Sequence, residues 1–250
     1  MRTLYVSDLD GTLLNEHAKL SSKTIEIINN LVSQGMLFTI ATGRSFDSSK
    51  EVTSGLDLRL PLILANGSYL VEPKTCKIIK ASSFLEYERD FIIETLSENG
   101  CHALVYTCVD GVEQKYYNVV SKEEIADLDV SKIIVKFENE SIGPLQKMFI
   151  DAGFSCYFYK SMYYEKQYWL EIYPENTDKA TAVKKLKEMA GADKVVCFGD
   201  GFNDIEMFKF CDESYATENS VQELKNIATG VIEKHTEDAV AKWLLERVNL

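Results

Sequence analysis

The chain has 250 residues, of which 46% are hydrophobic, and its 27 basic and 39 acidic residues give a formal net charge of −12. This length is enough for one large domain or two smaller ones. A surface with this charge repels nucleic acid and anionic membranes, so neither is an expected partner. A small anionic substrate remains compatible with it, because a metal ion and local Lys or Arg side chains can reverse the field inside one cleft.

No secretion signal is recognisable, and no apolar run approaches the roughly 18 residues that a membrane span needs. The six cysteines are scattered and form no Cys-x-x-Cys pair, a pattern typical of reduced thiols. We therefore expect a cytoplasmic protein without membrane contact, present as a monomer or a homodimer.

The first eighty residues alternate short apolar runs with helical patterns, which indicates parallel βα units. A helix is expected from Ser21, with Gly35 closing it, and a polar helix at 45–54. The turn Asn66-Gly67 follows the third strand. The strands expected here lie at 4–7, 37–41, 62–65, 69–71 and 78–79.

The pattern changes between residues 83 and 173, where helices alternate with longer and more polar strands. This block holds 8 basic and 16 acidic residues, a net charge of −8 out of the total of −12. Helices are expected at 87–98, 122–128 and 144–152, and strands at 102–108, 114–118, 132–137, 155–160 and 168–173. We interpret the block as an inserted α/β domain.

The βα rhythm returns after residue 173. The expected helices are 179–189, 203–208, 221–225 and 237–247, and the expected strands are 194–198, 214–216 and 231–232. The sequence thus predicts an α/β fold with a discontinuous parallel-sheet core, residues 1–82 and 174–250, and a cap domain, residues 83–173.

Reactive side chains follow the ends of the predicted core strands. Asp8 and Asp10 end the first strand, and alternate residues of an extended chain point the same way, so both can face one site. Strand two ends in Thr42, Gly43 and Arg44. Functional groups gather at the carboxyl ends of parallel strands, so we expect these side chains in one cleft. The remaining members are Asp200, Asn203 and Asp204, after the strand at 194–198, and Lys179, which opens a helix.

Several carboxylates in one cleft require a cation, and oxygen ligands suit Mg²⁺. Asp8 and Asp200 are the expected ligands, joined by the backbone carbonyl of Asp10. A carboxylate such as Asp8 can attack phosphorus to form an aspartyl-phosphate, while Asp10 is within reach to move the protons. The phosphoryl oxygens can then be bound by the Thr42 hydroxyl, the Gly43 amide and the Lys179 ammonium.

Each motif alone has a simpler interpretation. An Asp-x-Asp-Gly run is usually a turn, Thr42-Gly43-Arg44 is more often a helix cap, and Lys179 alone is a solvated lysine. Their order along the chain and their shared place at strand ends favour a phosphoryl-transfer site over these separate interpretations.

At these motifs the sequence resembles the haloacid dehalogenase superfamily of phosphatases, in its Cof-type branch with a large α/β cap. The four motifs are residues 8–13, 41–44, Lys179 and 199–207, so the resemblance covers nearly the whole chain. It implies a Rossmann-like core, Mg²⁺, Asp8 as nucleophile and Asp10 as acid and base. It also implies that Asp204 supports the metal or orients Lys179.

The resemblance carries further, weaker implications. Asn66 matches an asparagine that commonly faces the substrate, and Asn203 one that often touches the phosphate. Residues 218–220 stand where the family usually has Asn-Ala, so Ser220 is a mild departure. No change falls on a position of the expected chemistry.

The cap domain is expected to select the substrate, because the core groups handle only the phosphate. Arg44 and Arg89 could contact a second anionic group, although Arg89 is expected on the surface of an acidic helix. Aromatic residues crowd one predicted hairpin and either contact a ring-bearing leaving group or only pack across strands. These residues are Tyr157, Tyr159, Tyr163, Tyr164, Tyr168 and Trp169.

The sequence therefore predicts Mg²⁺-dependent hydrolysis of a small-molecule phosphate monoester, such as a sugar phosphate, a nucleotide or a phosphorylated cofactor. A phosphomutase would use the same aspartyl-phosphate and return the phosphoryl group to the product. A phospho-receiver module also clusters Asp, Thr and Lys, but carries its Asp on a later strand and lacks a second domain. A non-catalytic binding protein on this fold would be expected to lose Asp8 or Asp10.

Overall fold

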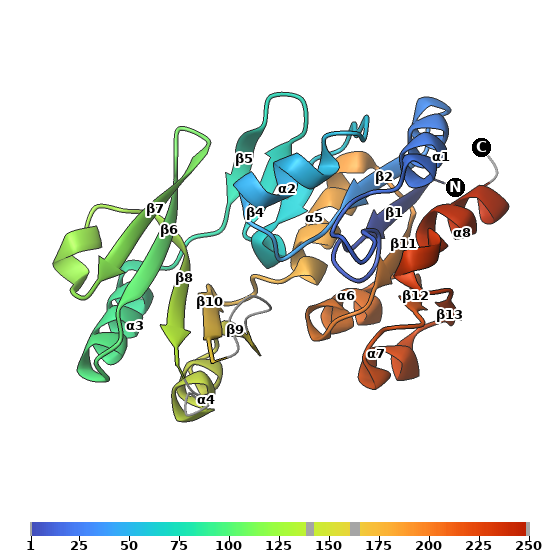
Figure 1. The fold of residues 1–250 in the computed structure, drawn as a ribbon. Coiled ribbons are helices and arrows are strands. Elements are labelled where there is room, and N and C mark those ends of the chain that lie inside the picture. Colours follow the sequence, from blue (N-terminus) through green and yellow to red (C-terminus); the bar gives the residue numbers. More distant parts are fainter. Residues whose placement is uncertain (1, 139–142, 161–165, 249–250) are drawn as a thin grey trace. The chain divides into compact units, whose positions relative to one another are not determined.

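The computed structural model describes residues 2–138, 143–160 and 166–248. It divides into two compact units: the core unit, residues 1–79 and 178–250, and the inserted unit, residues 80–177. The sequence placed the corresponding boundaries after residues 82 and 173. In Figure 1 the blue and red ends of the chain meet in the core unit, and the inserted unit runs from teal to yellow.

A five-stranded sheet in the order β13-β12-β11-β1-β2 forms the centre of the core unit, and its neighbouring strands pair in parallel. Its strands are β1 (Thr3–Ser7), β2 (Leu37–Ile40), β11 (Lys194–Gly199), β12 (Glu213–Thr217) and β13 (Gly230–Ile232). The pairing of β1 with β11 joins the two ends of the chain, as the α/β prediction requires.

Helices flank this sheet (Figure 1). They are α1 (Ser22–Ser33), α2 (Phe46–Thr53), α5 (Lys179–Ala190), α6 (Ile205–Phe210), α7 (Gln222–Ile227) and α8 (Ala239–Arg247), with short 3₁₀ turns η3 (Phe202–Asp204) and η4 (His235–Glu237). The Ser21 hydroxyl caps α1 by accepting a hydrogen bond from the Thr24 amide, as the sequence predicts for this helix start.

The two faces of the core sheet are covered differently. Apolar residues of α5, α6 and α7, among them Val183, Met207 and Leu224, pack on strand residues such as Val6 and Val195. On the opposite face of the sheet, the Trp243 ring of α8 contacts the rings of Tyr5, Phe198 and Tyr215. Helices therefore bury the sheet from both sides, which leaves the strand ends as the place where polar side chains can gather.

A small antiparallel sheet follows β2 in the chain. It contains β3 (Leu62–Leu64), β4 (Tyr69–Glu72) and β5 (Lys77–Ala81), and the turn η1 (Ala65–Gly67) joins β3 to β4. A parallel bridge between Ala41 and Ile63 places β3 beside the end of β2. The Asn66 side chain is thereby brought close to the Thr42 loop.

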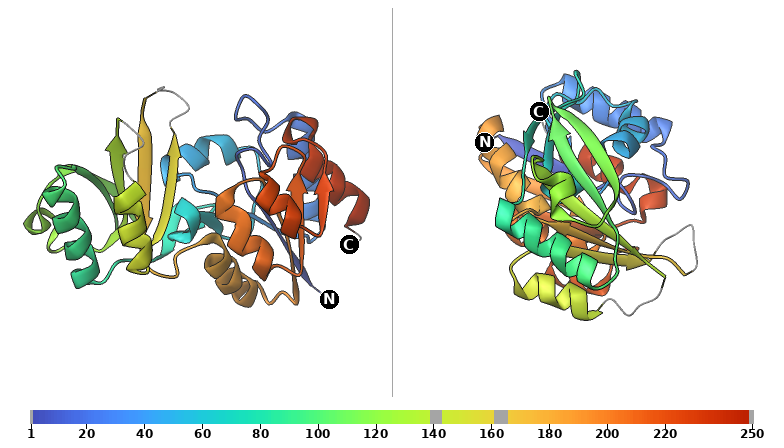
Figure 2. Two further views of the ribbon diagram at one scale, coloured as in Figure 1. Left: turned by 90° about the horizontal axis from the view of Figure 1, so that it is seen from below. Right: turned by 90° about the vertical axis from the view of Figure 1, so that its left-hand side faces the viewer.

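The inserted unit is an antiparallel sheet in the order β7-β6-β8-β10-β9, with helices packed on it (Figure 2). Its elements are α3 (Glu86–Glu98), β6 (Ala103–Val109), β7 (Val112–Val119), η2 (Lys122–Ile125), β8 (Val130–Phe137), α4 (Gly143–Asp151), β9 (Ser155–Lys160) and β10 (Tyr168–Tyr173). One sheet face packs with α3 and α4 into a single hydrophobic core that includes Ile92, Phe149, Ile133 and Leu170.

Two expectations for the inserted unit are wrong. The predicted helix at 122–128 is only the 3₁₀ turn η2, which ends at buried Ile125; the Glu124 carboxylate caps its start by accepting from the Val120 and Ser121 amides. Arg89 is buried rather than on the surface: its Nη1 donates to the Ala126 carbonyl at 2.8 Å. A guanidinium has enough donors to satisfy backbone carbonyls from inside a domain, which the pattern of an acidic helix does not reveal.

The aromatic residues of the β9–β10 hairpin contact one another. Tyr168 stacks on Phe158 with ring centroids 5.6 Å apart, and Tyr157 meets Tyr173 edge-on at 5.7 Å. The Tyr159 hydroxyl donates to Glu171 at 2.9 Å. Tyr163 and Tyr164 lie outside the described residues. Packing therefore accounts for a large part of this aromatic group.

Candidate active site

Two carboxylates from opposite ends of the chain meet where β1 and β11 end. Ser7 lies opposite Phe198 in the parallel register, and the Asp8 amide donates to the Phe198 carbonyl at 2.9 Å. Asp8 directly follows β1 and Asp200 directly follows β11. With Asp204 of η3 they form a group whose carboxylate oxygens, one from each residue, lie within 4.8 Å of one another.

Lys179, the first residue of α5, lies inside this acidic group. Its Nζ donates to Asp8 Oδ1 and to Asp204 Oδ1, both at 2.6 Å. The side chains of Lys179 and Asp204 are 0% exposed, and that of Asp8 is 7% exposed. One ammonium cannot balance three carboxylates, so the group retains negative charge in a buried place and favours a further cation.

Asp204 is held from both sides. While its Oδ1 accepts from Lys179, its Oδ2 accepts from the amides of Asp200 and Gly201, each at 3.0 Å. A Cβ on Gly199 would lie 2.6 Å from the Asp204 carboxyl carbon, so only glycine leaves room here. The Asp204 carboxylate is therefore fully engaged in fixing Lys179 and the loop that carries Asp200.

The buried charged groups of the site shift one another's pKa values. Burial raises the pKa of Asp8 well above its ordinary value, and the attraction of Lys179 offsets only part of this. Burial, with repulsion from Asp204, raises the pKa of Asp200 to about 6. For Lys179 burial acts to lower the pKa, but the attraction of Asp204 and Asp8 outweighs it and raises the pKa above 10.5. The lysine stays charged, and the carboxylates are ones that a cation would stabilise.

Asp10 does not join the acidic group with its side chain. Its carboxylate, 47% exposed, accepts two hydrogen bonds from Arg44, from Nε at 2.7 Å and from Nη2 at 2.6 Å. Arg44 Nη1 also donates to the Ser48 carbonyl at 3.2 Å. Asp10 is thus an anionic partner of Arg44 in this structure.

The remaining expected residues form a polar rim beside the acidic group. Thr42 Oγ1 accepts from the Arg44 amide at 3.2 Å, and the Thr42 carbonyl accepts from the Asn66 amide at 3.0 Å. Asn203 Nδ2 donates to Asn66 Oδ1 at 2.9 Å. A Cβ on Gly43 would lie 3.1 Å from that same oxygen. The rim therefore links the loop after β2, the turn η1 and the turn η3.

Sequence reasoning gave no role to several residues that support the site. Thr12 Oγ1 donates to Asp200 Oδ1 at 3.2 Å. The Gly11 carbonyl accepts from Asn219 Nδ2 at 2.8 Å and from Thr217 Oγ1 at 3.1 Å. No local pattern predicts contacts between residues about two hundred positions apart. The sequence signal for Asn219 was that residues 218–220 stand where the resembled family usually has Asn-Ala.

The donor set fits Mg²⁺. The acidic group offers carboxylate oxygens and no sulfur or imidazole ligand among the residues that the structure describes, and hard oxygen donors suit this ion. Asp8 Oδ2 and the Asp200 carboxylate make no bond to Lys179, whereas Asp204 uses one oxygen for Lys179 and the other for the amides of Asp200 and Gly201. Asp8 and Asp200 therefore fit as direct ligands and Asp204 as a supporting residue.

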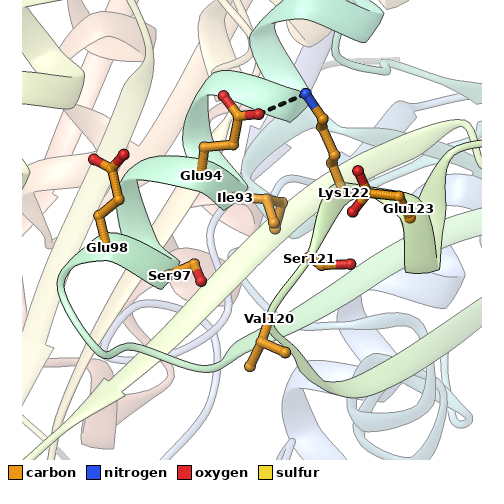
Figure 3. A pocket seen from close by; sticks show the side chains of 8 residues that line it. All are labelled: Ile93, Glu94, Ser97, Glu98, Val120, Ser121, Lys122 and Glu123. Atoms are coloured by element: carbon orange, nitrogen blue, oxygen red, sulfur yellow. Dashed lines mark ion pairs between the residues drawn. The ribbon is translucent and has the colours of Figure 1, made fainter.

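A surface hollow of about 290 Å³ in the inserted unit does not suit a phosphate ester (Figure 3). Its charged lining consists of Glu94, Glu98 and Glu123 with one cation, Lys122, which pairs with Glu94 at 2.5 Å. Carboxylates without a spare cation repel phosphate. The acidic group of the core unit remains the candidate site.

Comparisons with known proteins identify the family of the chain. Residues 5–244 match the haloacid dehalogenase-like hydrolase family, so the chain belongs to that family. It is similar to two Bacillus subtilis (strain 168) proteins named 5-amino-6-(5-phospho-D-ribitylamino)uracil phosphatase, YitU and YwtE. Identity to YitU is 24%, over 99% of this chain and 98% of YitU. Identity to YwtE is 27%, over 95% of each.

Solved structures show the same fold. The crystal structure of TM0651 from Thermotoga maritima aligns with a TM-score of 0.79 at 25% identity, over 100% of this chain and 98% of that one. A haloacid dehalogenase-like hydrolase from Bacteroides thetaiotaomicron aligns with a TM-score of 0.79 at 21% identity, over 100% of both chains. The expected fold class is confirmed, and the chain is a phosphatase-type hydrolase. Across the described residues, none of the helices has the length and apolarity of a membrane span.

Proposed function

We propose that the protein hydrolyses a small-molecule phosphate monoester with Mg²⁺, through an aspartyl-phosphate on Asp8. The observation that carries the proposal is the position of Lys179, whose ammonium bonds both Asp8 and Asp204 inside a buried acidic group. A structural ion pair would need one carboxylate for one lysine. The excess of buried carboxylate supports a site for a cation and a phosphoryl group.

In this proposal Asp8, Asp200 and the backbone carbonyl of Asp10 hold Mg²⁺, and Asp204 supports them. The ion would neutralise the carboxylates and the oxygens of the phosphoryl group. Lys179, the Thr42 hydroxyl and the Gly43 amide bind the transferring phosphoryl oxygens. Arg44, Asn66 and Asn203 contribute to binding of the phosphate or the rest of the substrate.

The chemistry has two steps. A carboxylate oxygen of Asp8 bonds to phosphorus while the ester P–O bond breaks, and Asp10 gives a proton to the leaving oxygen. Water then attacks the phosphorus of the aspartyl-phosphate, Asp10 takes up a proton from that water, and the Asp8–phosphate bond breaks to release inorganic phosphate. In both steps the Asp10 carboxylate must reach the substrate or the water, so it must give up at least one of its two hydrogen bonds from Arg44.

The inserted unit, residues 83–173 in the sequence-based division, is proposed as the cap that selects the substrate, a phosphorylated metabolite. Relatives named for 5-amino-6-(5-phospho-D-ribitylamino)uracil make that ester the first natural compound to test. Sugar phosphates, nucleotides and phosphorylated cofactors complete the panel.

The test measures phosphate release from p-nitrophenyl phosphate with and without Mg²⁺. We expect activity that requires the ion, and mass spectrometry of acid-quenched protein should detect one phosphoryl group on Asp8. Asp8→Asn should abolish both signals, whereas exposed Asp57→Asn should keep them. Activity that survives in Asp8→Asn would refute the proposal, and isomers appearing without free phosphate would identify a mutase instead.

A further inference from the structure

The segment that follows β12 in the core unit makes hydrogen bonds to both loops that carry the expected metal ligands. β12 lies beside β11 in the core sheet, and Thr217 is its last residue (Figure 1). Since β1, β11 and β12 run parallel, the loops after these strands lie at one edge of the sheet. We call residues 217–221 the clasp segment.

On one side the clasp segment holds the loop after β1. Asn219 Nδ2 donates to the Gly11 carbonyl at 2.8 Å, and Thr217 Oγ1 donates to the same oxygen at 3.1 Å. These two bonds use both acceptor positions of the carbonyl oxygen, so they fix the direction of the Gly11–Thr12 peptide. The Thr12 hydroxyl, which follows this peptide, donates to Asp200 Oδ1 at 3.2 Å.

On the other side the clasp segment holds the loop after β11. The Val221 amide donates to the Asp200 carbonyl at 3.0 Å, and Ser220 Oγ donates to the Gly199 carbonyl at 3.2 Å. The buried hydroxyl oxygens of Ser220 and Thr217 lie 3.1 Å apart, which joins the hydrogen bonds of the two loops into one network. The spacing between the two loops is therefore set by residues that belong to neither.

The Asn219 amide is held at both of its ends. Its Oδ1 accepts from the His235 amide at 3.2 Å, while its Nδ2 donates to the Gly11 carbonyl. A carbonyl requires a donor and an N–H requires an acceptor, so a turned amide would lose both bonds. His235 Nδ1 in turn lies 2.7 Å from the Leu14 carbonyl. Asn219 and His235 thus hold the loop after β1 at two of its carbonyl groups.

We propose that Thr217 and Asn219 are positioning residues that set the affinity of the site for Mg²⁺. Gly11 follows Asp8 in the same loop and leaves no room for a side chain against Asp200, so a shift of the Gly11 peptide displaces the two ligands relative to each other. Mg²⁺ demands near-ideal octahedral geometry, and its affinity depends on the groups that orient its ligands. The inference rests on the proposed Mg²⁺-dependent function, and the two residues take no part in the transfer itself.

The experiment measures Mg²⁺ binding by isothermal titration calorimetry, which needs no turnover. Asn219 is exposed, so Asn219→Leu keeps the size of the side chain and removes its hydrogen bonds without disturbing the core. We expect this variant to bind Mg²⁺ about 10- to 100-fold more weakly, the range for losing a group that orients a metal ligand. Thr217→Val should weaken binding as well, whereas Thr217→Ser retains the hydroxyl and should keep the wild-type affinity.

Asn29 of α1 offers a matched control. Its Nδ2 donates to the Gly55 carbonyl at 2.9 Å and its Oδ1 accepts from the Asp57 amide at 2.8 Å, the same pair of bonds that Asn219 makes. Asn29→Leu and Asn219→Leu should therefore lower Tm in EDTA to a similar degree. Only Asn219→Leu should weaken Mg²⁺ binding, which separates positioning of the ligands from general stability.

Unchanged Mg²⁺ affinity in Asn219→Leu and Thr217→Val would overturn the inference, and so would an equal loss in Asn29→Leu or a wild-type protein that binds no Mg²⁺. If Asn219→Leu does not fold, the comparison of Thr217→Val with Thr217→Ser decides. If the wild-type protein binds Mg²⁺ but does not hydrolyse p-nitrophenyl phosphate, the proposed function fails, and the affinities of the variants still decide the role of the clasp segment.

Discussion

Arg44 holds the Asp10 carboxylate with two hydrogen bonds, from Nε at 2.7 Å and from Nη2 at 2.6 Å. The planar guanidinium matches the two carboxylate oxygens in a way that a lysine ammonium cannot. Arg44 therefore sets the direction of a side chain that is otherwise about half exposed.

Arg44→Lys should lower kcat with p-nitrophenyl phosphate about tenfold, because a single ammonium leaves the Asp10 carboxyl free to turn away from the leaving oxygen. Steady-state kinetics with saturating Mg²⁺ measures the effect. Arg59→Lys, which changes an exposed arginine, should retain the wild-type kcat. Full activity in Arg44→Lys would show that the bidentate pair does not position Asp10.

Lys179→Met should destabilise the metal-free protein by about 3–5 kcal/mol near pH 7.5, because it leaves buried Asp8 and Asp204 without their cation. Urea denaturation measures the change. The loss should be smaller near pH 5, where carboxyls with raised pKa values take up protons instead of staying charged. Exposed Lys184→Met in the same helix is the control, and equal losses in both variants would contradict the interpretation.

Gly11→Ala should abolish most activity. An alanine Cβ at this position would lie 2.1 Å from Asp200 Oδ2, so the carboxylate must move, and a displacement of this size can reduce turnover about 100-fold. Gly100 has a similar φ, +68° against +74°, and no atom within 4 Å of its added Cβ. Both variants should lose about 1 kcal/mol from backbone strain, but only Gly11→Ala should lose activity. Phosphate release and thermal unfolding together separate these effects.

The pH dependence of the metal-free protein follows from Asp200. Burial raises its pKa from 3.8 to about 6, so the folded state binds more protons than the unfolded state between these values. The free energy of unfolding should therefore fall as pH rises through that interval. Mg²⁺ binds the ionised carboxylate, so it should raise Tm more at about pH 7.5 than at about pH 5. Asp200→Asn should remove most of this difference, and an equal Mg²⁺ effect at both pH values would argue against Asp200 as a ligand.

The sequence predicted the strands that matter most because their apolar runs end in short polar motifs. Asp8 and Asp200 follow β1 and β11, and parallel pairing brings the ends of such strands together without further information. Pairing between side chains was not predictable in this way. The bonds from Arg44 to Asp10, and from Asn219 to the Gly11 carbonyl, depend on loop conformations that no periodicity encodes.

The structure contradicts two sequence-based expectations for the inserted unit. Arg89 was expected on the surface because charged residues rarely lie inside a domain. It is buried instead, and its guanidinium donates to backbone carbonyls of the same unit. Helix periodicity also overestimated the segment at 122–128, of which only Lys122–Ile125 form a 3₁₀ turn.

The pairing of β1 with β11 has a consequence for synthesis on the ribosome. Residues 3–7 leave the ribosome long before their partners at 194–198, so β1 has no parallel neighbour on that side until late in translation. The inserted unit, residues 80–177, is complete by then and makes mostly its own contacts. Contacts of such long sequence separation form slowly, and the waiting apolar strands are exposed to aggregation. The nascent chain should therefore acquire its inserted unit first, and a chain that stops before residue 194 should leave Asp8 on a strand without its partner.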